Sequence, residues 1–221
     1  FLAAIIGISG CSRQKEEKLT KYDTQFFELF DTVTSVTGYA RDEKTFQSYV
    51  DVFYDELNEY HQLYDIYNDY EGINNIKTIN DHAGIEPVGV DDKIIQMLEE
   101  AVDIYELTDG SMNVAMGSVL SIWHEYREAG LKHPEQAQLP PQEELEEAAK
   151  HMDIRKMVID PEKKTVYLED PDMSLDVGAI AKGYAAEMAS RKVEEAGLKH
   201  ALISVGGNIR CIGTKPDGKK W

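Results

Sequence analysis

One run of eleven residues constrains the fold of this chain more than any other feature of its sequence. Residues 174–184 read Ser-Leu-Asp-Val-Gly-Ala-Ile-Ala-Lys-Gly-Tyr. The pattern predicts a strand that delivers Asp176 to its C-terminal end, followed by a helix over about 179–196. Gly178 lies between them, where the absence of a side chain lets the backbone come close to a ligand. The run therefore predicts a sheet and a helix that meet at one point.

That point has the chemistry of a phosphate site. A helix N-terminus presents free N–H groups and the positive end of the helix dipole. Lys182 adds a full positive charge in the first turn, and Asp176 is placed to accept hydrogen bonds from a heterocycle or a ribose. The backbone carbonyl near Ala179 is placed to face a hard cation. The same pattern also fits an ordinary capped helix with a solvated lysine, and the sequence has neither a dinucleotide fingerprint nor a Walker loop.

The remaining hydrophobic pattern predicts an α+β fold with mixed sheets and flanking helices. Apolar residues at three- and four-residue steps predict helices, short or alternating apolar runs predict strands, and glycine or proline clusters predict loops. The elements that we expect are a strand pair within 25–40, a helix from Asp42 to about Asp65, a helix from Asp91 or Asp92 to near Gly110, a loop over 130–141, a short acidic helix over 143–150, a hairpin of 157–159 with 165–168, and a strand over 201–205 that ends in Gly206-Gly207.

The charge of the chain excludes two classes of partner. With 23 Lys and Arg against 41 Asp and Glu, the formal net charge is −18. A nucleic-acid-binding protein needs a basic face, so we expect no nucleic acid. An anionic bilayer repels such a chain as well. Because 42% of the residues are hydrophobic and 9% are aromatic, the chain has the composition of a folded acidic protein and not of a disordered one.

The first residues predict a lipid anchor. The chain opens on ten mostly apolar residues, too few to span a bilayer, which resemble the end of a secretory signal peptide. Ile8-Ser9-Gly10-Cys11 resembles a bacterial lipobox, whose cysteine is diacylated, and the alternative is a chance apolar start. We expect residues 1–11 to be the remnant of the signal peptide, 12–24 to be a flexible tether, and 25–221 to be the folded domain.

These expectations place the protein in the bacterial cell envelope. Lipidation of Cys11 predicts an extracytoplasmic protein that touches the membrane only through its anchor. It also leaves Cys211 without an internal partner, and we expect Cys211 to be a small buried hydrophobic residue. Residues 213–221 have the pattern of a turn that enters a new strand, so both ends are expected to be cuts in a longer protein.

Three weaker motifs supply groups that suit a planar ring. Ser111, Met112 and Asn113 close the second predicted helix, where an amide can read the edge of a ring and a methionine can pack on its face. Phe30 and Tyr67 supply aromatic rings beside turns. Taken singly, each motif is also typical of a helix cap or a core aromatic residue, and the histidines show no metal-ligand spacing.

Taken together and in this order, these motifs resemble those of the ApbE family, the FAD:protein FMN transferases of bacteria. The resemblance is carried by Phe30-Asp31-Thr32, Tyr67, 73–80, 108–123, 175–184 and 206–213. It implies an ApbE-like flavin transferase fold whose C-terminal part lies beyond this sequence. It also implies the family's reaction, in which FAD is cut at its pyrophosphate with the help of Mg²⁺, FMN is transferred to a Thr or Ser hydroxyl of a target protein, and AMP is released.

The resemblance further implies roles for particular residues. Ala179 matches a Mg²⁺ ligand that acts through its backbone carbonyl, and the remaining ligands are implied beyond Trp221, so we expect the chain as written to bind the metal weakly. The implied acceptors are exported FMN-binding proteins, such as subunits of the Na⁺-translocating NADH:quinone reductase or of Rnf-type complexes. The sequence does not identify a base that would deprotonate the acceptor hydroxyl. The residues that match FAD-contacting positions are Phe30, Tyr67, Ser111, Met112, Asn113, Asp176 and Lys182.

Two other functions stay open at this point. An FAD pyrophosphatase would use the same pocket and metal with water in place of the protein hydroxyl, giving free FMN and AMP. A lipid-anchored protein that holds flavin without chemistry would bind FAD and release no AMP.

Overall fold

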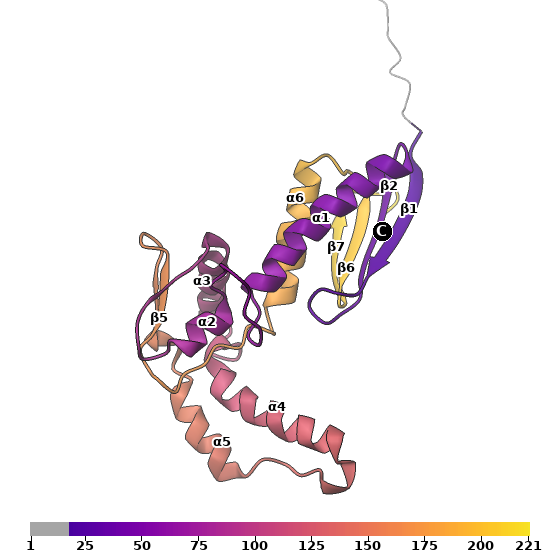
Figure 1. The fold of residues 1–221 in the computed structure, drawn as a ribbon. Coiled ribbons are helices and arrows are strands. Elements are labelled where there is room, and N and C mark those ends of the chain that lie inside the picture. Colours follow the sequence, from indigo (N-terminus) through magenta and orange to yellow (C-terminus); the bar gives the residue numbers. More distant parts are fainter. Residues whose placement is uncertain (1–17) are drawn as a thin grey trace, which may run out of the picture.

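The longest strands form one antiparallel sheet (Figure 1) in this computed structural model, which describes residues 18–221. The spatial order of the strands is β1-β2-β6-β7. Alternate residues of β2 are buried, and its central place is fixed by pairing on both sides, with Thr34 opposite both Phe26 and Val205. The strands are β1 (Thr20–Phe26), β2 (Thr34–Ala40), β6 (Ala201–Val205) and β7 (Asn208–Ile212).

Two long helices, α1 (Glu43–Leu63) and α6 (Ala181–Glu195), pack against each other and against this sheet. The predicted helix from Asp42 is confirmed, because the Asp42 carboxylate accepts a hydrogen bond from Thr45 N at 2.7 Å and caps α1. The apolar face of α1 is buried along its whole length, as its three- and four-residue spacing predicts. Its buried residues are Phe46, Val50, Phe53, Leu57, Tyr60 and Leu63.

A second, smaller antiparallel sheet has the strand order β3-β5-β4, and two helices accompany it. The predicted hairpin is confirmed, with Met157 opposite Leu168 and Asp160 opposite Thr165. The second predicted helix is also confirmed, because the Asp91 side chain caps it by accepting from Lys93 N at 2.8 Å. The elements are α2 (Ile76–Asp81), β3 (Val88–Gly89), α3 (Asp92–Leu107), β4 (Met157–Asp160) and β5 (Thr165–Leu168).

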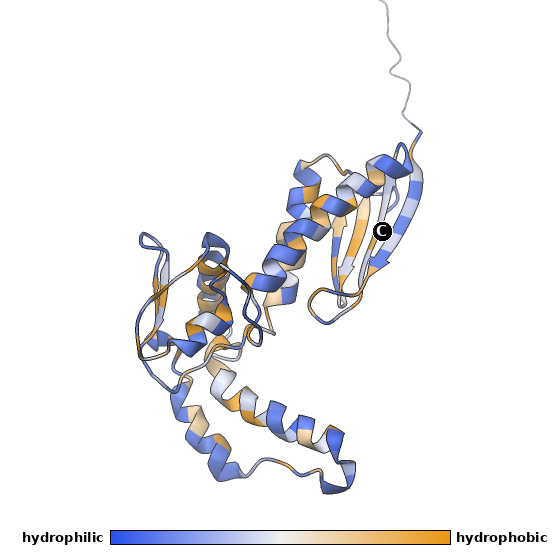
Figure 2. Ribbon diagram, in the orientation of Figure 1, coloured by the Kyte–Doolittle hydropathy of each residue, from blue (hydrophilic) through white to orange (hydrophobic). Residues whose placement is uncertain are grey.

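Helices α4 (Gly117–Lys132) and α5 (Gln142–Ala148) form an arm that extends away from the four-stranded sheet (Figure 1). The hydropathy colouring is mainly blue along α5 and alternates between blue, white and orange along α4, whereas β6 is mainly orange (Figure 2). No long helix was predicted at α4, and the predicted loop over 130–141 was wrong for its first residues, which belong to this helix. Short 3-10 helices lie at Val114–Met116, Pro134–Gln136, Ala149–His151 and Ile154–Lys156.

One boundary and the burial of one residue differ from the sequence predictions. β1 begins at Thr20, so residues 20–24, expected in the tether, pair with β2. Cys211 is exposed and is not the buried residue that we predicted, because it lies on the same face of β7 as the exposed Ile209. Cys11 and the predicted signal remnant lie outside the described residues. Within 18–221, no helix has both the length and the apolar character that crossing a membrane requires.

The segment that carries Asp176 is not a strand, contrary to the prediction. Residues 173–177 have no regular structure and pair with no strand. Their backbone groups are satisfied by other means, since the Asn80 side chain accepts from Leu175 N at 2.7 Å and donates to Leu175 O at 3.0 Å. Asp176 N donates to Val114 O at 2.8 Å. A side-chain amide and a turn thus replace the expected sheet neighbour.

This segment also touches the start of α4, which gives a stability prediction. Gly117 N donates to Ser174 O at 2.9 Å, and a Cβ built on Gly117 would lie 2.5 Å from that same oxygen. Gly117→Ala should therefore reduce the free energy of unfolding by about 1–3 kcal/mol through overpacking against backbone. Gly89→Ala is the matched control, because nothing lies within 4 Å of its added methyl group. Urea unfolding of both variants checks this, and equal stabilities would contradict the close packing.

Candidate functional site

Two adjoining cavities open beside the start of α6. The first cavity has a volume of about 380 Å³ and the second about 480 Å³, both within the range of small-molecule sites. Tyr67, His124 and Asp176 line both cavities, together with Asp31 and Ile66, so the two are parts of one depression. The predicted residues Phe30, Tyr67, Asp176 and Lys182 all line the first cavity.

The start of α6 gives the first cavity its positive end. The N-cap residue Ile180 makes no side-chain capping bond. The N–H groups of Ile180 and Ala181 donate to Val177 O at 3.0 and 2.8 Å, and those of Lys182 and Gly183 have no backbone partner within residues 18–221, so they stay available. Ala181 and Lys182 line the cavity, as Gly178 does. The Asp176 carboxylate accepts from Gly178 N at 2.8 Å, which holds it at the approach to the helix. The helix N-terminus and the lysine can together bind a phosphate group.

The loop between β1 and β2 supplies the cavity's strained residues. Phe30 and Asp31 have φ angles of 55° and 49°, a left-handed conformation that is uncommon for residues other than glycine. Phe30 N donates to the Nδ1 atom of His61 at 3.3 Å, and the two rings are 5.4 Å apart between centroids. Such strain costs on the order of 1–3 kcal/mol per residue and is typical of ligand-binding loops.

The turn after α1 supplies Tyr67. Asp65 accepts from Tyr67 N at 2.7 Å and from Tyr70 Oη at 2.8 Å, which fixes the turn. Burial raises the pKa of Asp65, but the hydrogen bonds that it accepts outweigh this effect and leave the pKa below its ordinary value. The carboxyl group of Asp65 is therefore ionised at neutral pH, and it adds negative charge to the first cavity.

The run Ser111–Asn113 lies away from the residues that line the two cavities. It follows α3, and the Asn113 amide is occupied, because its Oδ1 accepts from Ala115 N at 2.8 Å and its Nδ2 donates to Met152 O at 2.9 Å. The side chain caps a turn instead of facing the cavity. The run is nevertheless connected to it, since Val114 O accepts the backbone N–H of Asp176.

Sequence reasoning missed three polar groups at the site. Asn80 fixes the backbone beside Asp176, and His124 and His61 support Tyr67 and Phe30. Each acts on a residue that is distant in the sequence, with separations of 95 residues for Asn80 to Leu175 and 57 for His124 to Tyr67. No local pattern marks such a pair, so only a spatial structure reveals it.

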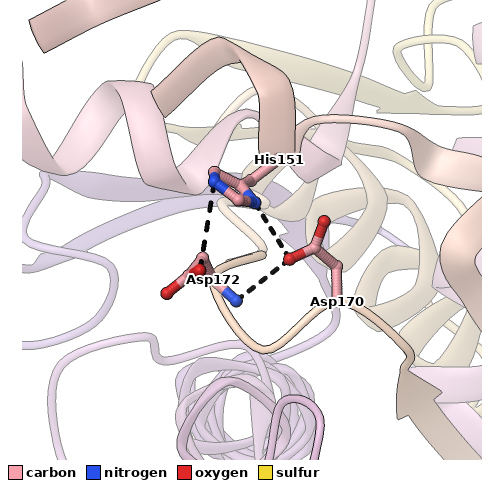
Figure 3. A group of neighbouring side chains, drawn as sticks. All are labelled: His151, Asp170 and Asp172. Atoms are coloured by element: carbon pink, nitrogen blue, oxygen red, sulfur yellow. Dashed lines mark hydrogen bonds and ion pairs between the residues drawn. The ribbon is translucent and has the colours of Figure 1, made fainter. Parts of the chain in front are cut away.

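Two places in the described residues offer metal ligands. Ala179 precedes α6 and is exposed, and its carbonyl receives no backbone hydrogen bond in the described range, so it is free to bind a hard cation. The second place is the group of His151, Asp170 and Asp172, whose ligand atoms lie within 4.8 Å of one another (Figure 3). It lies outside the lining of both cavities.

The second group is better explained as an ion network. The buried Asp170 carboxylate accepts from His151 Nδ1 at 2.9 Å and from Asp172 N at 3.1 Å (Figure 3). It also accepts from Lys156 Nζ at 2.8 Å. Its oxygens are therefore satisfied without a metal, and an imidazole ligand does not suit Mg²⁺, which prefers oxygen. The network ties the turn at His151 to the segment after β5.

The geometry is that of an α+β domain with a cavity suited to an aromatic, phosphate-bearing ligand. The chain belongs to the ApbE family, whose family model matches residues 30–221. It is 26% identical over 220 residues to the FAD:protein FMN transferase of Vibrio cholerae, covering 100% of this chain and 62% of that protein. It is 32% identical over 145 residues to the FAD:protein FMN transferase of Treponema pallidum, covering 63% of this chain and 38% of that protein.

Solved structures support the same assignment. The ApbE protein of Thermotoga maritima has a TM-score of 0.74 and 25% identity, over 90% of this chain and 61% of that one. The flavin transferase ApbE of Vibrio cholerae has a TM-score of 0.72 and 20% identity, over 91% of this chain and 63% of that one, and this likeness concerns the fold. The α+β class predicted from the sequence is confirmed, although every strand pairing in the described residues is antiparallel.

The Asp170 network predicts a pH dependence of stability. The hydrogen bond from Lys156 lowers the pKa of Asp170 from 3.8 to about 2. A carboxyl group with a depressed folded-state pKa contributes stability above its unfolded pKa and loses it as the pH falls through the folded value. Asp170→Asn should therefore be less stable than the wild type at pH 7, and the difference should shrink by roughly 1–2 kcal/mol between pH 5 and pH 2.

Urea unfolding across this pH range checks the prediction. Asp103→Asn is the matched control, because Asp103 is an exposed aspartate on α3. Its difference from the wild type should stay constant with pH. A constant difference for Asp170→Asn as well would show that Lys156 does not hold the carboxylate ionised.

Proposed function

We propose that this protein transfers FMN from FAD to a Thr or Ser hydroxyl of a target protein and releases AMP. The observation that carries the proposal is the uncapped N-terminus of α6, with Lys182, at a cavity that Phe30 and Tyr67 also line. The names of the relatives support the same chemistry. The chain spans 62% of the length of its Vibrio cholerae relative, so the activity of the whole enzyme is part of the proposal.

In the proposed reaction, the pyrophosphate of FAD lies at the start of α6. The hydroxyl oxygen of the acceptor attacks the phosphorus atom on the riboflavin side, and the bond from that phosphorus to the bridging oxygen breaks. AMP leaves with the electron pair, and the hydroxyl proton passes to a base or to solvent. The free N–H groups of α6 and the Lys182 ammonium stabilise the negative charge that this transfer concentrates on the phosphates.

The proposal includes Mg²⁺ with the Ala179 carbonyl as one ligand. The free carbonyl and the preference of Mg²⁺ for oxygen ligands support this assignment. When bound, the ion would neutralise phosphate charge and orient the diphosphate.

The remaining expected contacts are proposed as follows. Phe30, Tyr67 and Asp176 contact FAD within the first cavity, which they line. Ser111 and Met112 do not line the cavity and are proposed as FAD contacts on the family resemblance alone. Asn113 has the least structural support among the proposed FAD contacts, because its amide would have to give up the two hydrogen bonds that it makes.

We also propose the location and the partners. Cys11 carries the lipid anchor on the extracytoplasmic side of the bacterial envelope, and the acceptors are exported FMN-binding proteins such as subunits of the Na⁺-translocating NADH:quinone reductase or of Rnf-type complexes. The lipobox pattern Ile8-Ser9-Gly10-Cys11 supports the anchor. Mass spectrometry of the protein from bacterial membranes tests it, and an unmodified Cys11 would contradict it.

An assay with FAD, Mg²⁺ and a threonine-bearing acceptor domain tests the function in the full-length protein. We expect a fluorescent acceptor band on a denaturing gel, and one AMP for each flavin attached. Free FMN with AMP and no labelled acceptor would instead identify a pyrophosphatase. FAD binding without AMP would identify a flavin-holding protein, and no FAD binding would contradict all three functions.

Lys182 tests the phosphate site directly. Lys182→Ala removes a charged contact of the kind that contributes about 1.5–3 kcal/mol, so FAD binding should weaken by roughly 10- to 100-fold. Lys192→Ala removes a lysine from the last turn of the same helix and should bind FAD like the wild type. Calorimetric titration with FAD measures both. Equal affinities for the two variants would remove the start of α6 from the binding site.

A further inference from the structure

Tyr67 occupies an unusual place for a large aromatic residue. It lines both cavities, and 60% of its surface is exposed. Tyr67 therefore separates the two cavities, and its ring can contact a ligand in either of them. A ligand that stacks on a mobile side chain loses affinity, because ordering that side chain on binding costs free energy. An exposed ring is therefore a better stacking surface when a hydrogen bond already fixes its orientation.

Two contacts from different elements hold Tyr67. Its backbone N–H is held by Asp65, within its own turn. Its phenol Oη lies 2.9 Å from the Nδ1 atom of His124 on α4, and the two ring centroids are 6.1 Å apart. In the part of the chain that the structure describes, His124 is the one polar partner of the phenol. His124 thus holds the end of the side chain that its own turn leaves free.

The chemistry of this hydrogen bond follows from its two partners. Partial burial raises the pKa of Tyr67, and the negative charge of Asp176 raises it further. The phenol therefore stays protonated, and its hydroxyl can donate to the Nδ1 atom of His124 or accept from it, according to the tautomer of the imidazole. An amide oxygen placed where Nδ1 lies would accept the same bond, which an apolar side chain cannot do.

We propose that His124 is a positioning residue that holds the Tyr67 ring in place for the planar ring system of FAD, an inference that rests on the proposed function. His124 does this through the phenol hydroxyl and need not touch the flavin. The bond also joins α4 to the turn after α1, since the partners are 57 residues apart. The arm that carries α4 is thereby coupled to the ligand site.

A double-mutant cycle in the full-length protein tests the proposal. Tyr67→Phe keeps the ring and removes the hydroxyl, and His124→Leu removes its hydrogen-bond partner. Each should weaken FAD binding by about 3- to 10-fold, the cost of ordering one free aromatic side chain. The double variant should be no weaker than either single variant, because both remove the same hydrogen bond. Calorimetric titration with FAD gives the four affinities.

A rescue variant and a spectroscopic readout separate positioning from a general loss of structure. His124→Asn places an amide oxygen near the position of Nδ1 and should keep the affinity within about twofold of the wild type. Tyr126→Phe is the matched control on α4, because its hydroxyl bonds Glu144 outside both cavities. In the wild type, stacking on Tyr67 should quench the emission of bound flavin. His124→Leu should restore part of that emission, and His124→Asn should not.

The outcomes distinguish this inference from the proposed function. If the wild type binds FAD but the two single variants add independently, or if His124→Asn is as weak as His124→Leu, then His124 does not position Tyr67 and the proposed function stands. If the wild type binds no FAD, the proposed function fails and the inference fails with it.

Discussion

The arrangement of the site depends on the pairing of the Asn80 side chain with the backbone of Leu175. This amide makes the two hydrogen bonds that a neighbouring strand would otherwise make, at 2.7 and 3.0 Å. It therefore holds an irregular segment in place without a neighbouring strand. Because this segment leads directly into α6, its position also sets where the first turn of that helix points. The backbone N–H of Asp176, which donates to Val114 O, gives the same segment a further fixed contact.

The body of α6 is fixed independently of its start. It packs against α1 and the four-stranded sheet, and the Tyr184 ring lies 6.4 Å from Tyr60 and 6.3 Å from Tyr64, between centroids. The contacts that fix the body of α6 are thus different from the contacts that fix the segment leading into its first turn. The first turn of α6 needs no capping side chain of its own, because packing and the Asn80 segment already define it. In the part of the chain that the structure describes, the N–H groups of Lys182 and Gly183 have no backbone partner and remain free for a ligand, which is why this helix start can serve both the fold and the site.

Most elements with local signals were predictable from the sequence, and elements with distant partners were not. The helix after Asp42 was predictable because its apolar spacing and its cap are both local, and the hairpin of β4 and β5 was predictable from two short apolar runs around a turn. Helix α4 was missed although apolar and aromatic residues recur along it at three- and four-residue steps, namely Val119, Ile122, Trp123 and Tyr126. The strand expected at Asp176 was wrong because apolar residues suggested a sheet, while the actual partner is a polar side chain 95 residues away. At the site, Lys182 followed from the helix start alone. The local pattern marked Phe30 and Tyr67 only as aromatic residues beside turns, and their contact with FAD was implied by the family resemblance.

The charge balance of the first cavity supports the proposed role of a cation in binding the substrate. Three carboxylates line it, those of Asp31, Asp65 and Asp176, against the single ammonium of Lys182. The diphosphate of a dinucleotide would add further negative charge to this group, and close like charges in a partly buried site repel strongly. The N-terminus of α6 contributes only a partial positive charge. A divalent cation at the free carbonyl of Ala179 would offset the excess, so the proposed dependence on Mg²⁺ follows from the electrostatics of this cavity as well as from the family.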